Sequence, residues 1–287
     1  MIPTLNEARN LAVVLPSLPR RYDIVVVDGG STDETETVVR QVRPDSTFIR
    51  QSRTGKGNAL VCGFHVARGD VIVMFDADGS ADPAEIPRFV QALRAGADFA
   101  KGSRVLGGGG SADITRIRGI GNRALTGLAS LLFGVDYTDL CYGYNAFWRD
   151  VLPLLDLPDP VPPVRREMRE GDGFEIETLL NCRVAVAELA VVEVPSFELD
   201  RVHGVSNLDA IADGRRVLKT MVSEYLRKRR VERLLAHQGE LLSARRLFAQ
   251  RQQATMSSAA PAQAARRAGR GVGSGAPNRA APYELAG

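Results

Sequence analysis

Short apolar runs alternate with amphipathic stretches along the first hundred residues. We expect buried strands at residues 24–27, 46–50, 71–75 and 99–102. We expect helices from about residue 33, at 57–67 and at 83–94, the last with Pro83 in its first turn. Strands that alternate with helices predict a mostly parallel sheet with helices on both faces.

The second half of the chain has a less regular pattern. We expect helices at residues 118–133, 174–182 and 208–226, and strands at 144–149 and 189–194. The glycine run 107–110 predicts a flexible loop. Residues 2–4 look like the end of a strand, so either the native start lies upstream or the first strand is short.

Acidic side chains follow two of the expected strands. Asp28 comes at the end of the first apolar run, and Asp76 and Asp78 follow the run 71–75. Ligands of such sheets bind beyond the carboxyl ends of the strands, so we expect both loops to face one pocket. Asp76 and Asp78 could hold one Mg²⁺ together with substrate phosphates. The competing interpretations are solvated acids for this pair and an Asx-turn or helix cap for Asp28.

Composition says more about where in the cell the protein works than about its reaction. The chain has 287 residues, enough for one large or two small domains. Its three cysteines are odd in number and match no metal or disulfide spacing, which favours a reducing cytoplasm. The sequence shows no signal peptide pattern and no apolar run long enough to predict a transmembrane helix.

Charge divides the chain unevenly. From Leu226 onward there are 12 basic and 3 acidic residues, against 25 basic and 31 acidic ones before it. We therefore expect a catalytic domain at 1–226, a basic amphipathic helix at 227–250 and a disordered tail at 251–287. The basic part could contact an anionic membrane surface at the inner face, bind nucleic acid, or stay solvated. The acidic body argues against nucleic acid as a partner of the catalytic domain.

Six short motifs occur in an order that resembles a known family. They cover residues 2–7 (Ile-Pro-Thr-Leu-Asn-Glu), 27–33 (Val-Asp-Gly-Gly-Ser-Thr-Asp), 55–59 (Gly-Lys-Gly-Asn-Ala), 75–78 (Phe-Asp-Ala-Asp), 82–83 (Asp-Pro) and 102–104 (Gly-Ser-Arg). Together they closely resemble family 2 glycosyltransferases, and within them the dolichol- or polyprenyl-phosphate mannose and glucose synthases. The resemblance is specific over residues 2–104 and looser to about 226.

This resemblance implies a fold and a reaction. The fold would be GT-A, a Rossmann-like α/β sheet with helices on both faces in a single catalytic domain. The enzyme would move a hexose from a nucleotide-diphosphate sugar, GDP-mannose or UDP-glucose, to a polyprenyl phosphate. It would use Mg²⁺ or Mn²⁺ and invert the anomeric centre.

The resemblance also implies roles on the donor side. Pro3, Thr4, Glu7 and Asp28 would line the nucleotide pocket, and Lys56 and Gly57 would lie in a loop beside it. Of the acids, Asp76 would contact the ribose, the diphosphate or the metal, and Asp78 would be the main metal ligand. Ser80 stands where these synthases often have glutamine as a further ligand.

The acceptor side matches the family less well. Arg104 would contact a donor or acceptor phosphate. Arg118 would contact the acceptor, although Arg116 and Arg123 compete for that role. The late element with Arg201 and Ser206 resembles the family's Arg-x-x-Gly-x-Ser, although Asn207 replaces the usual lysine and Tyr142 stands at an earlier position where serine is usual.

Two further carboxylates could act if the acceptor were a hydroxyl. Glu175 and Glu177 lie two places apart on an expected helix, so they cannot both face one site. One of them could be a general base, and we expect the other to be solvated. His65, His203 and His237 are scattered and suggest no metal triad.

The expected chemistry has two alternatives. A phosphate monoester is already largely dianionic at neutral pH and needs no general base, which explains a demand for arginine. The first alternative is a transferase with a soluble acceptor, because residues 101–104 and 173–177 faintly resemble retaining glucosyl-3-phosphoglycerate synthases. The second is a non-catalytic sugar-nucleotide-binding protein, against which the intact pair Asp76 and Asp78 argues.

Overall fold

The computed structural model describes residues 1–160, 168–204 and 210–238. The chain forms two compact units, residues 1–228 and 229–287. Of the second unit the structure describes only the helical residues 229–238. Ser206 lies outside the described residues.

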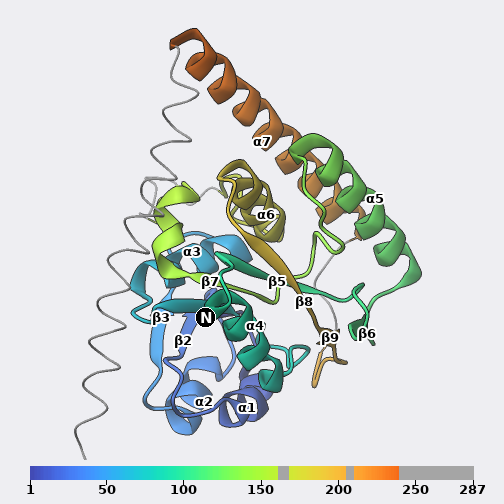
Figure 1. Cartoon of the computed structure of the whole chain (residues 1–287). Coiled ribbons are helices and arrows are strands. Elements are labelled where there is room, and N and C mark those ends of the chain that lie inside the picture. Colours follow the sequence, from blue (N-terminus) through green and yellow to red (C-terminus); the bar gives the residue numbers. More distant parts are fainter. Residues whose placement is uncertain (161–167, 205–209, 239–287) are drawn as a thin grey trace, which may run out of the picture. The chain divides into compact units, whose positions relative to one another are not determined.

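Strands and helices alternate through the first hundred residues, as expected (Figure 1). The strands are β1 (Ile2–Thr4), β2 (Val25–Asp28), β3 (Thr47–Arg50), β4 (Val71–Met74), β5 (Phe99–Ser103), β6 (Gly110–Ser111), β7 (Asn145–Trp148), β8 (Val191–Pro195) and β9 (Phe197–Glu198). The α-helices are α1 (Ala8–Ser17), α2 (Thr35–Val42), α3 (Lys56–Val66), α4 (Ile86–Arg94), α5 (Arg116–Phe133), α6 (Ile176–Val186) and α7 (Ala210–Gln238). Two 3₁₀ helices are η1 (Pro83–Glu85) and η2 (Arg149–Leu154).

Most strand pairs are parallel. Strands β1, β2 and β3 form a parallel sheet, and β4, β7, β5 and β8, in that order, form a mixed sheet. Strand β7 runs antiparallel to both of its neighbours, while β5 and β8 pair in parallel. The Met1 ammonium donates to the Val73 carbonyl and the Phe75 N–H donates to the Met1 carbonyl, so hydrogen bonds join the edges of the two sheets.

Alternate side chains of β2 explain the helices on both faces. Val26 packs in a core with Leu11 of α1 and Phe89 of α4. Its neighbours Val25 and Val27 point to the opposite face, where they pack with residues of α3. The sequence predicted this layered fold, although it did not predict α1.

Helices α5, α6 and α7 share a separate apolar cluster. Phe133 of α5, Cys182 of α6 and Met221 of α7 are buried in it. Helix α7 continues beyond residue 226, where we expected a domain to end. That boundary stays a prediction, as does membrane attachment of the basic segment. Within the part of the chain that the structure describes, none of the helices combines the length and apolarity needed to cross a bilayer.

Candidate active site

A cavity of about 880 Å³ lies beyond the carboxyl ends of β1 and β4. Nine of the candidates for donor, metal or acceptor binding line it: Pro3, Thr4, Glu7, Lys56, Asp76, Asp78, Arg104, Arg118 and Arg201. Gly29 and Asp33, from the loop after β2, line it as well, so the expected convergence of the two strand-end loops on one pocket is confirmed. Three of the other candidates, Asp28, Gly57 and Ser80, are not among the lining residues.

Lys56 connects two carboxylates at the floor of the cavity. Its Nζ lies 2.7 Å from Oδ1 of Asp76 and 2.8 Å from Oε1 of Glu177. Burial alone would lower the pKa of Lys56, but the two carboxylates outweigh it and raise that pKa, so the side chain stays charged. Burial raises the pKa of Glu177, and the Lys56 ammonium opposes this effect. Lys56 is the first residue of α3, so its side chain joins the start of this helix to Asp76 beyond the end of β4.

Asp78 is held from two directions. The Ser80 N–H and hydroxyl both donate to its Oδ1, at 3.0 and 2.7 Å, while Arg201 lies 2.7 Å from its Oδ2. Ser80 therefore orients Asp78 instead of reaching the cavity, and this geometry gives no support to a metal-ligand role for Ser80. Backbone bonds from Leu199 to Ser80 and from Val202 to Asp78 bring Arg201 to this position.

Asp28 and Gly57 each have a local structural role. The buried carboxylate of Asp28 accepts the backbone N–H groups of Gly30 and Ser31, as in an Asx-turn, while the neighbouring Gly29 lines the cavity. Gly57 lies in the first turn of α3, where a Cβ would collide with the Gly171 carbonyl. Close packing against Gly171 explains why this position is a glycine. The loop that the family resemblance implied at Lys56 and Gly57 is the first turn of a helix.

The two glutamates near the start of α6 separate as their spacing predicted. Glu177 faces the cavity, whereas Glu175 does not. The expectation that the second glutamate is solvated was wrong. Glu175 is buried and accepts the N–H groups of Gly171 and Gly173, because the loop before α6 folds back over it.

Arg104 joins the sheet to the loop before β7. It makes two bonds to the Asp139 carboxylate, at 2.7 and 2.9 Å, and one to Glu198 at 3.0 Å. Asn122 of α5 donates to the same Asp139 at 2.9 Å. Burial would raise the pKa of Asp139, but the bonds from Arg104 lower it below its ordinary value. Arg104 reaches the cavity from within this network, and its contact with a phosphate stays a prediction.

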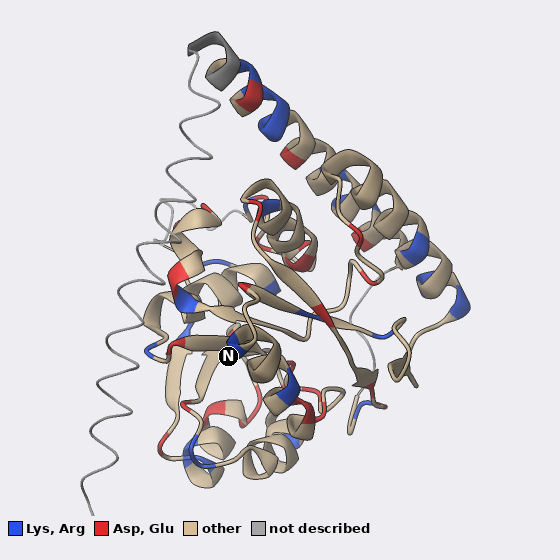
Figure 2. Ribbon diagram, in the orientation of Figure 1, with Lys and Arg blue, Asp and Glu red and all other residues tan. Residues whose placement is uncertain are grey.

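Arg118 is the arginine of the 116–123 group that lines the cavity. Its guanidinium lies 3.5 Å from the carboxylate of Asp113. Thr115 caps α5 by accepting the Arg118 N–H, and the first turn of this helix has no acid. Figure 2 shows basic residues at this end of α5. A capped helix start with an arginine is a favourable place for a phosphate.

Sequence reasoning missed Arg9 and His203, which also line the cavity. The Arg9 guanidinium lies 3.5 Å from the His203 ring, and Asn10 donates to the His203 carbonyl. His203 belongs to no histidine triad, so its spacing from the other histidines does not point to a site. The usable signal was its place two residues after Arg201 in the late motif.

Glu7 shares this part of the cavity. Burial raises its pKa, the Asn10 hydrogen bond lowers it, and the nearby charge of Asp78 raises it again, so the net direction is upward. A nucleotide pocket near Glu7 stays a prediction.

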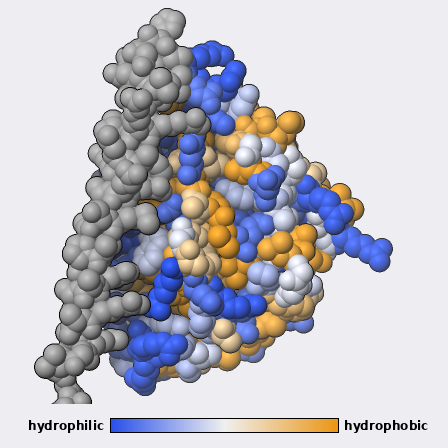
Figure 3. Space-filling model, viewed as in Figure 1, coloured by the Kyte–Doolittle hydropathy of each residue, from blue (hydrophilic) through white to orange (hydrophobic). Residues whose placement is uncertain are grey.

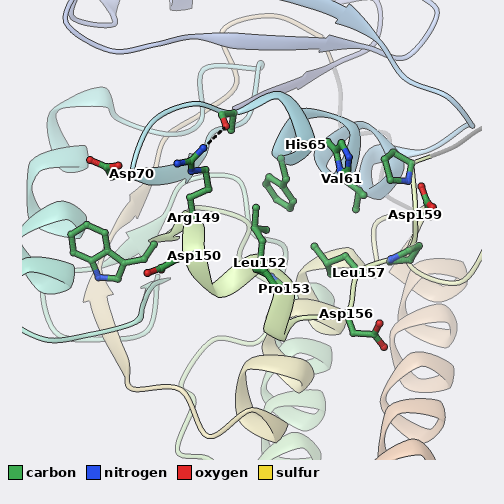
Figure 4. A pocket seen from close by; sticks show the side chains of 15 residues that line it. Val61, His65, Asp70, Arg149, Asp150, Leu152, Pro153, Asp156, Leu157 and Asp159 are labelled. Atoms are coloured by element: carbon green, nitrogen blue, oxygen red, sulfur yellow. Dashed lines mark hydrogen bonds between the residues drawn. The ribbon is translucent and has the colours of Figure 1, made fainter. Parts of the chain in front are cut away.

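A second cavity of about 1030 Å³ lies elsewhere, between α3 and η2 (Figure 4). Its wall combines apolar side chains such as Phe64 and Leu152 with His65, Arg149 and Asp150. None of the candidate site residues lines it. Size therefore does not identify the active site, whereas the charged groups at the strand ends do.

Comparison with known proteins agrees with this geometry. Residues 1–153 match the family model described as glycosyl transferase family 2. Polyprenol monophosphomannose synthase of Mycolicibacterium smegmatis is 33% identical over 219 residues, which cover 72% of this chain and 79% of that protein. Undecaprenyl-phosphate mannosyltransferase of Micrococcus luteus is 32% identical over 218 residues, covering 72% and 86%.

Solved structures support the fold alone. Glucosyl-3-phosphoglycerate synthase from Mycobacterium tuberculosis, in complex with phosphoglyceric acid, aligns with a TM-score of 0.60 and 23% identity over 78% of each chain. The same synthase with Mn²⁺, uridine diphosphate and glucosyl-3-phosphoglycerate aligns with a TM-score of 0.59, covering 78% of this chain and 77% of that one. These neighbours have the GT-A fold that the motifs implied. With a GT-A fold and a family match over more than half of its length, the chain belongs to glycosyltransferase family 2 and is an enzyme of that family.

Proposed function

We propose that this enzyme transfers a hexose from a nucleotide-diphosphate sugar to a polyprenyl phosphate, with inversion at the anomeric carbon. One observation carries the proposal: a single cavity holds Asp76 and Asp78 at one end and the arginine-bearing start of α5 at the other. The first end suits a metal–diphosphate group and the second a phosphate acceptor. By their names, one of the two relatives makes polyprenol monophosphomannose and the other is a mannosyltransferase of undecaprenyl phosphate.

The carboxylates fit a divalent cation only with help from the substrate. Among the described residues no cluster of three or more acidic, histidine or cysteine side chains could hold a metal. Mg²⁺ commonly takes one or two carboxylates and completes its shell with phosphate oxygens and water. Asp78 and Asp76 fit this pattern for Mg²⁺ or Mn²⁺. When bound, such an ion would stabilise the negative charge that develops on the leaving diphosphate.

The donor would lie against the carboxyl ends of β1 and β4. Pro3, Thr4 and Glu7 would line the nucleotide, with Lys56 nearby. Lys56 also keeps the carboxylates of Asp76 and Glu177 oriented, so that the pocket keeps its shape between turnovers. GDP-mannose and UDP-glucose are the first donors to test.

The acceptor phosphate would bind at Arg118, with Arg104 and Arg201 beside the leaving group. In a single displacement, an acceptor phosphate oxygen forms a bond to the anomeric carbon while the bond from that carbon to the diphosphate breaks. The electron pair of that bond leaves with the diphosphate. The acceptor is already largely dianionic, so the step needs no general base. The ion pair of Glu177 with Lys56 agrees with a positioning role for this glutamate.

The test is transfer of labelled sugar in the presence of Mg²⁺ or Mn²⁺. We expect label from one donor in the organic phase with a prenyl phosphate acceptor, and loss of that label when EDTA is added. Asp78→Asn should lower kcat on the order of 10²–10³-fold, the usual cost of removing one charge-stabilising group. Asp82→Asn is the matched control, because Asp82 caps η1 in the same segment and does not line the cavity.

Two results would contradict the proposal. Label confined to the aqueous phase, on a small phosphate or hydroxyl acceptor, would replace the lipid acceptor with a soluble one. Full transfer with EDTA present would show that the reaction needs no divalent metal ion.

A further inference from the structure

The cavity continues from the charged groups into a slot between α5 and α7. On α5, Ile117, Gly121 and Leu125 line it. On α7, Ile211, Gly214 and Val217 do so. Residues three or four places apart lie on the same face of a helix, so each helix presents one continuous strip to the slot. Apart from Arg118, Asn122 and Asp213, these two strips are made of apolar side chains and glycines.

Glycines keep the slot open at its middle. A Cβ built on Gly121 or on Gly214 meets no heavy atom within 4 Å. Glycine is a poor helix former, and neither residue is needed here for a left-handed backbone or for close packing. What the two glycines have in common is that each faces the cavity, where a larger side chain would project into it.

The two helices meet at one end of the slot and leave its other end accessible. Phe133 and Tyr225 make an edge-to-face contact at 6.4 Å between ring centroids, in the same cluster as Val217 and Met221. Toward the start of α5, Ile117 and Ile120 are 74% and 70% exposed. Figure 3 shows apolar side chains on the edge of the molecule where α5 lies, next to hydrophilic ones. The slot is thus closed by packing at one end and has an apolar rim at the other.

A polar group adjoins this apolar slot at a defined place. Arg118 lies one helical turn before Gly121 and Asn122, at the capped start of α5. A ligand that fits both parts has an anionic head for Arg118 and an apolar chain for the slot. Small hydrophilic phosphates would leave the slot filled with water against isoleucine and leucine side chains, at a cost in free energy.

We propose that the slot between α5 and α7 binds the isoprenoid chain of the acceptor next to its phosphate, and that Gly121 and Gly214 make room for it. The inference rests on the proposed function, because it takes the acceptor to be a prenyl phosphate. It adds that the enzyme selects its acceptor by the apolar chain as well as by the phosphate. Affinity should therefore rise from geranyl phosphate to farnesyl phosphate as more apolar surface is buried.

The experiment fills the slot. Gly121→Leu and Gly214→Leu place a side chain in it from opposite walls, and leucine favours the helical conformation. Gly127→Leu is the matched control, since Gly127 lies on the same α5, has equal space for a Cβ and does not line the cavity. Calorimetric titration with farnesyl phosphate measures acceptor binding directly, and titration with UDP or GDP measures the donor end.

We expect both slot variants to bind farnesyl phosphate at least about tenfold more weakly, with unchanged nucleotide affinity and Tm, and the control to match the unmodified chain. Equal farnesyl phosphate affinity in Gly121→Leu, Gly214→Leu and Gly127→Leu would overturn the inference, as would failure of the unmodified chain to bind farnesyl phosphate. If the unmodified chain binds farnesyl phosphate and the slot variants do not, but no sugar is transferred to it, the proposed function fails and the slot stands.

Discussion

The two ends of the cavity are built in different ways. At the carboxylate end, which we define as Lys56, Asp76, Asp78 and Glu177, each side chain has an oppositely charged partner within 3 Å. At the helix end, residues 114–125 and 210–217, the wall is mostly apolar and contains glycines. The carboxylate end is held by ion pairs, whereas the helix end is held by packing beyond the slot.

This difference suggests how family members can share a reaction and vary its acceptor. Charged groups at strand ends are fixed by the sheet, and a change there alters the chemistry itself. Side chains on two helix faces can change in size while the sheet stays the same. Substitutions at each end should therefore have different effects, and a substitution where the sheet meets the helix end should mainly affect stability.

The largest effect on stability is expected at Asp139. This buried carboxylate binds Arg104 from the sheet and Asn122 from α5, so it connects the sheet to the helix end. Asp139→Asn leaves the buried Arg104 short of one charge partner, which should lower the free energy of unfolding by about 3 kcal/mol. Urea denaturation at neutral pH measures the loss. Asp136→Asn, an exposed position in the same loop, is the control and should have little effect.

The pH dependence of this variant has a definite sign. The pKa of Asp139 is lowered by folding, so its contribution is complete above its ordinary value and is lost as the pH falls through the lowered one. The difference between the unmodified chain and Asp139→Asn should therefore shrink in acid. A gap that stays constant down to strongly acidic pH would mean that the Asp139 charge is not what stabilises this junction.

The two ends also differ in how well the sequence predicts them. Asp76 and Asp78 directly follow an apolar strand, and parallel topology then brings them to the cavity, so their place was predictable. The partners Arg201 and Glu177 come from segments more than a hundred residues away. Both residues are candidates from the sequence, but the sequence does not show that Arg201 pairs with Asp78 or that Lys56 bridges to Glu177.

The helix end was less predictable for a physical reason. The apolar stretch around Leu125 fits a core face as well as a ligand slot, and local periodicity cannot distinguish the two. Only the packing of α5 against α7 shows which part of each helix is covered, at Phe133 and Tyr225, and which part faces the cavity. Helix α1 was missed, although its buried residues Leu11, Val14 and Leu15 have helical spacing.

The next largest effect is expected when a charge is removed from the carboxylate end. Lys56→Met leaves Asp76 and Glu177 close together without their cation, so one of them should take up a proton. We expect kcat/KM for the donor to fall on the order of 10²-fold, about 2.7 kcal/mol, with little change in acceptor affinity. Steady-state kinetics with each substrate varied in turn measures both quantities.

A second substitution sharpens this result. Lys56→Met combined with Glu177→Gln removes both members of one ion pair and should recover part of the loss, because Asp76 no longer faces a second carboxylate. If the double variant is no better than the single one, the role of Lys56 is a direct contact with the donor and not the orientation of its neighbours.

The smallest effect is expected at Arg118, and it tests whether the two ends act independently. Arg118→Gln keeps a hydrogen-bond donor but removes the charge, so the KM for a prenyl phosphate should rise about tenfold, which is about 1.4 kcal/mol. The donor KM should change less, because Arg118 lies at the helix end and is linked to the carboxylate end only through Asp113, which lies 3.5 Å from Arg118 and 3.6 Å from Arg201. Arg123→Gln, on the same helix but outside the cavity, should leave both constants unchanged. A rise in the donor KM with an unchanged acceptor KM would assign Arg118 to the carboxylate end, and the division of the cavity into a charged end for the donor and a helical end for the acceptor would then be wrong.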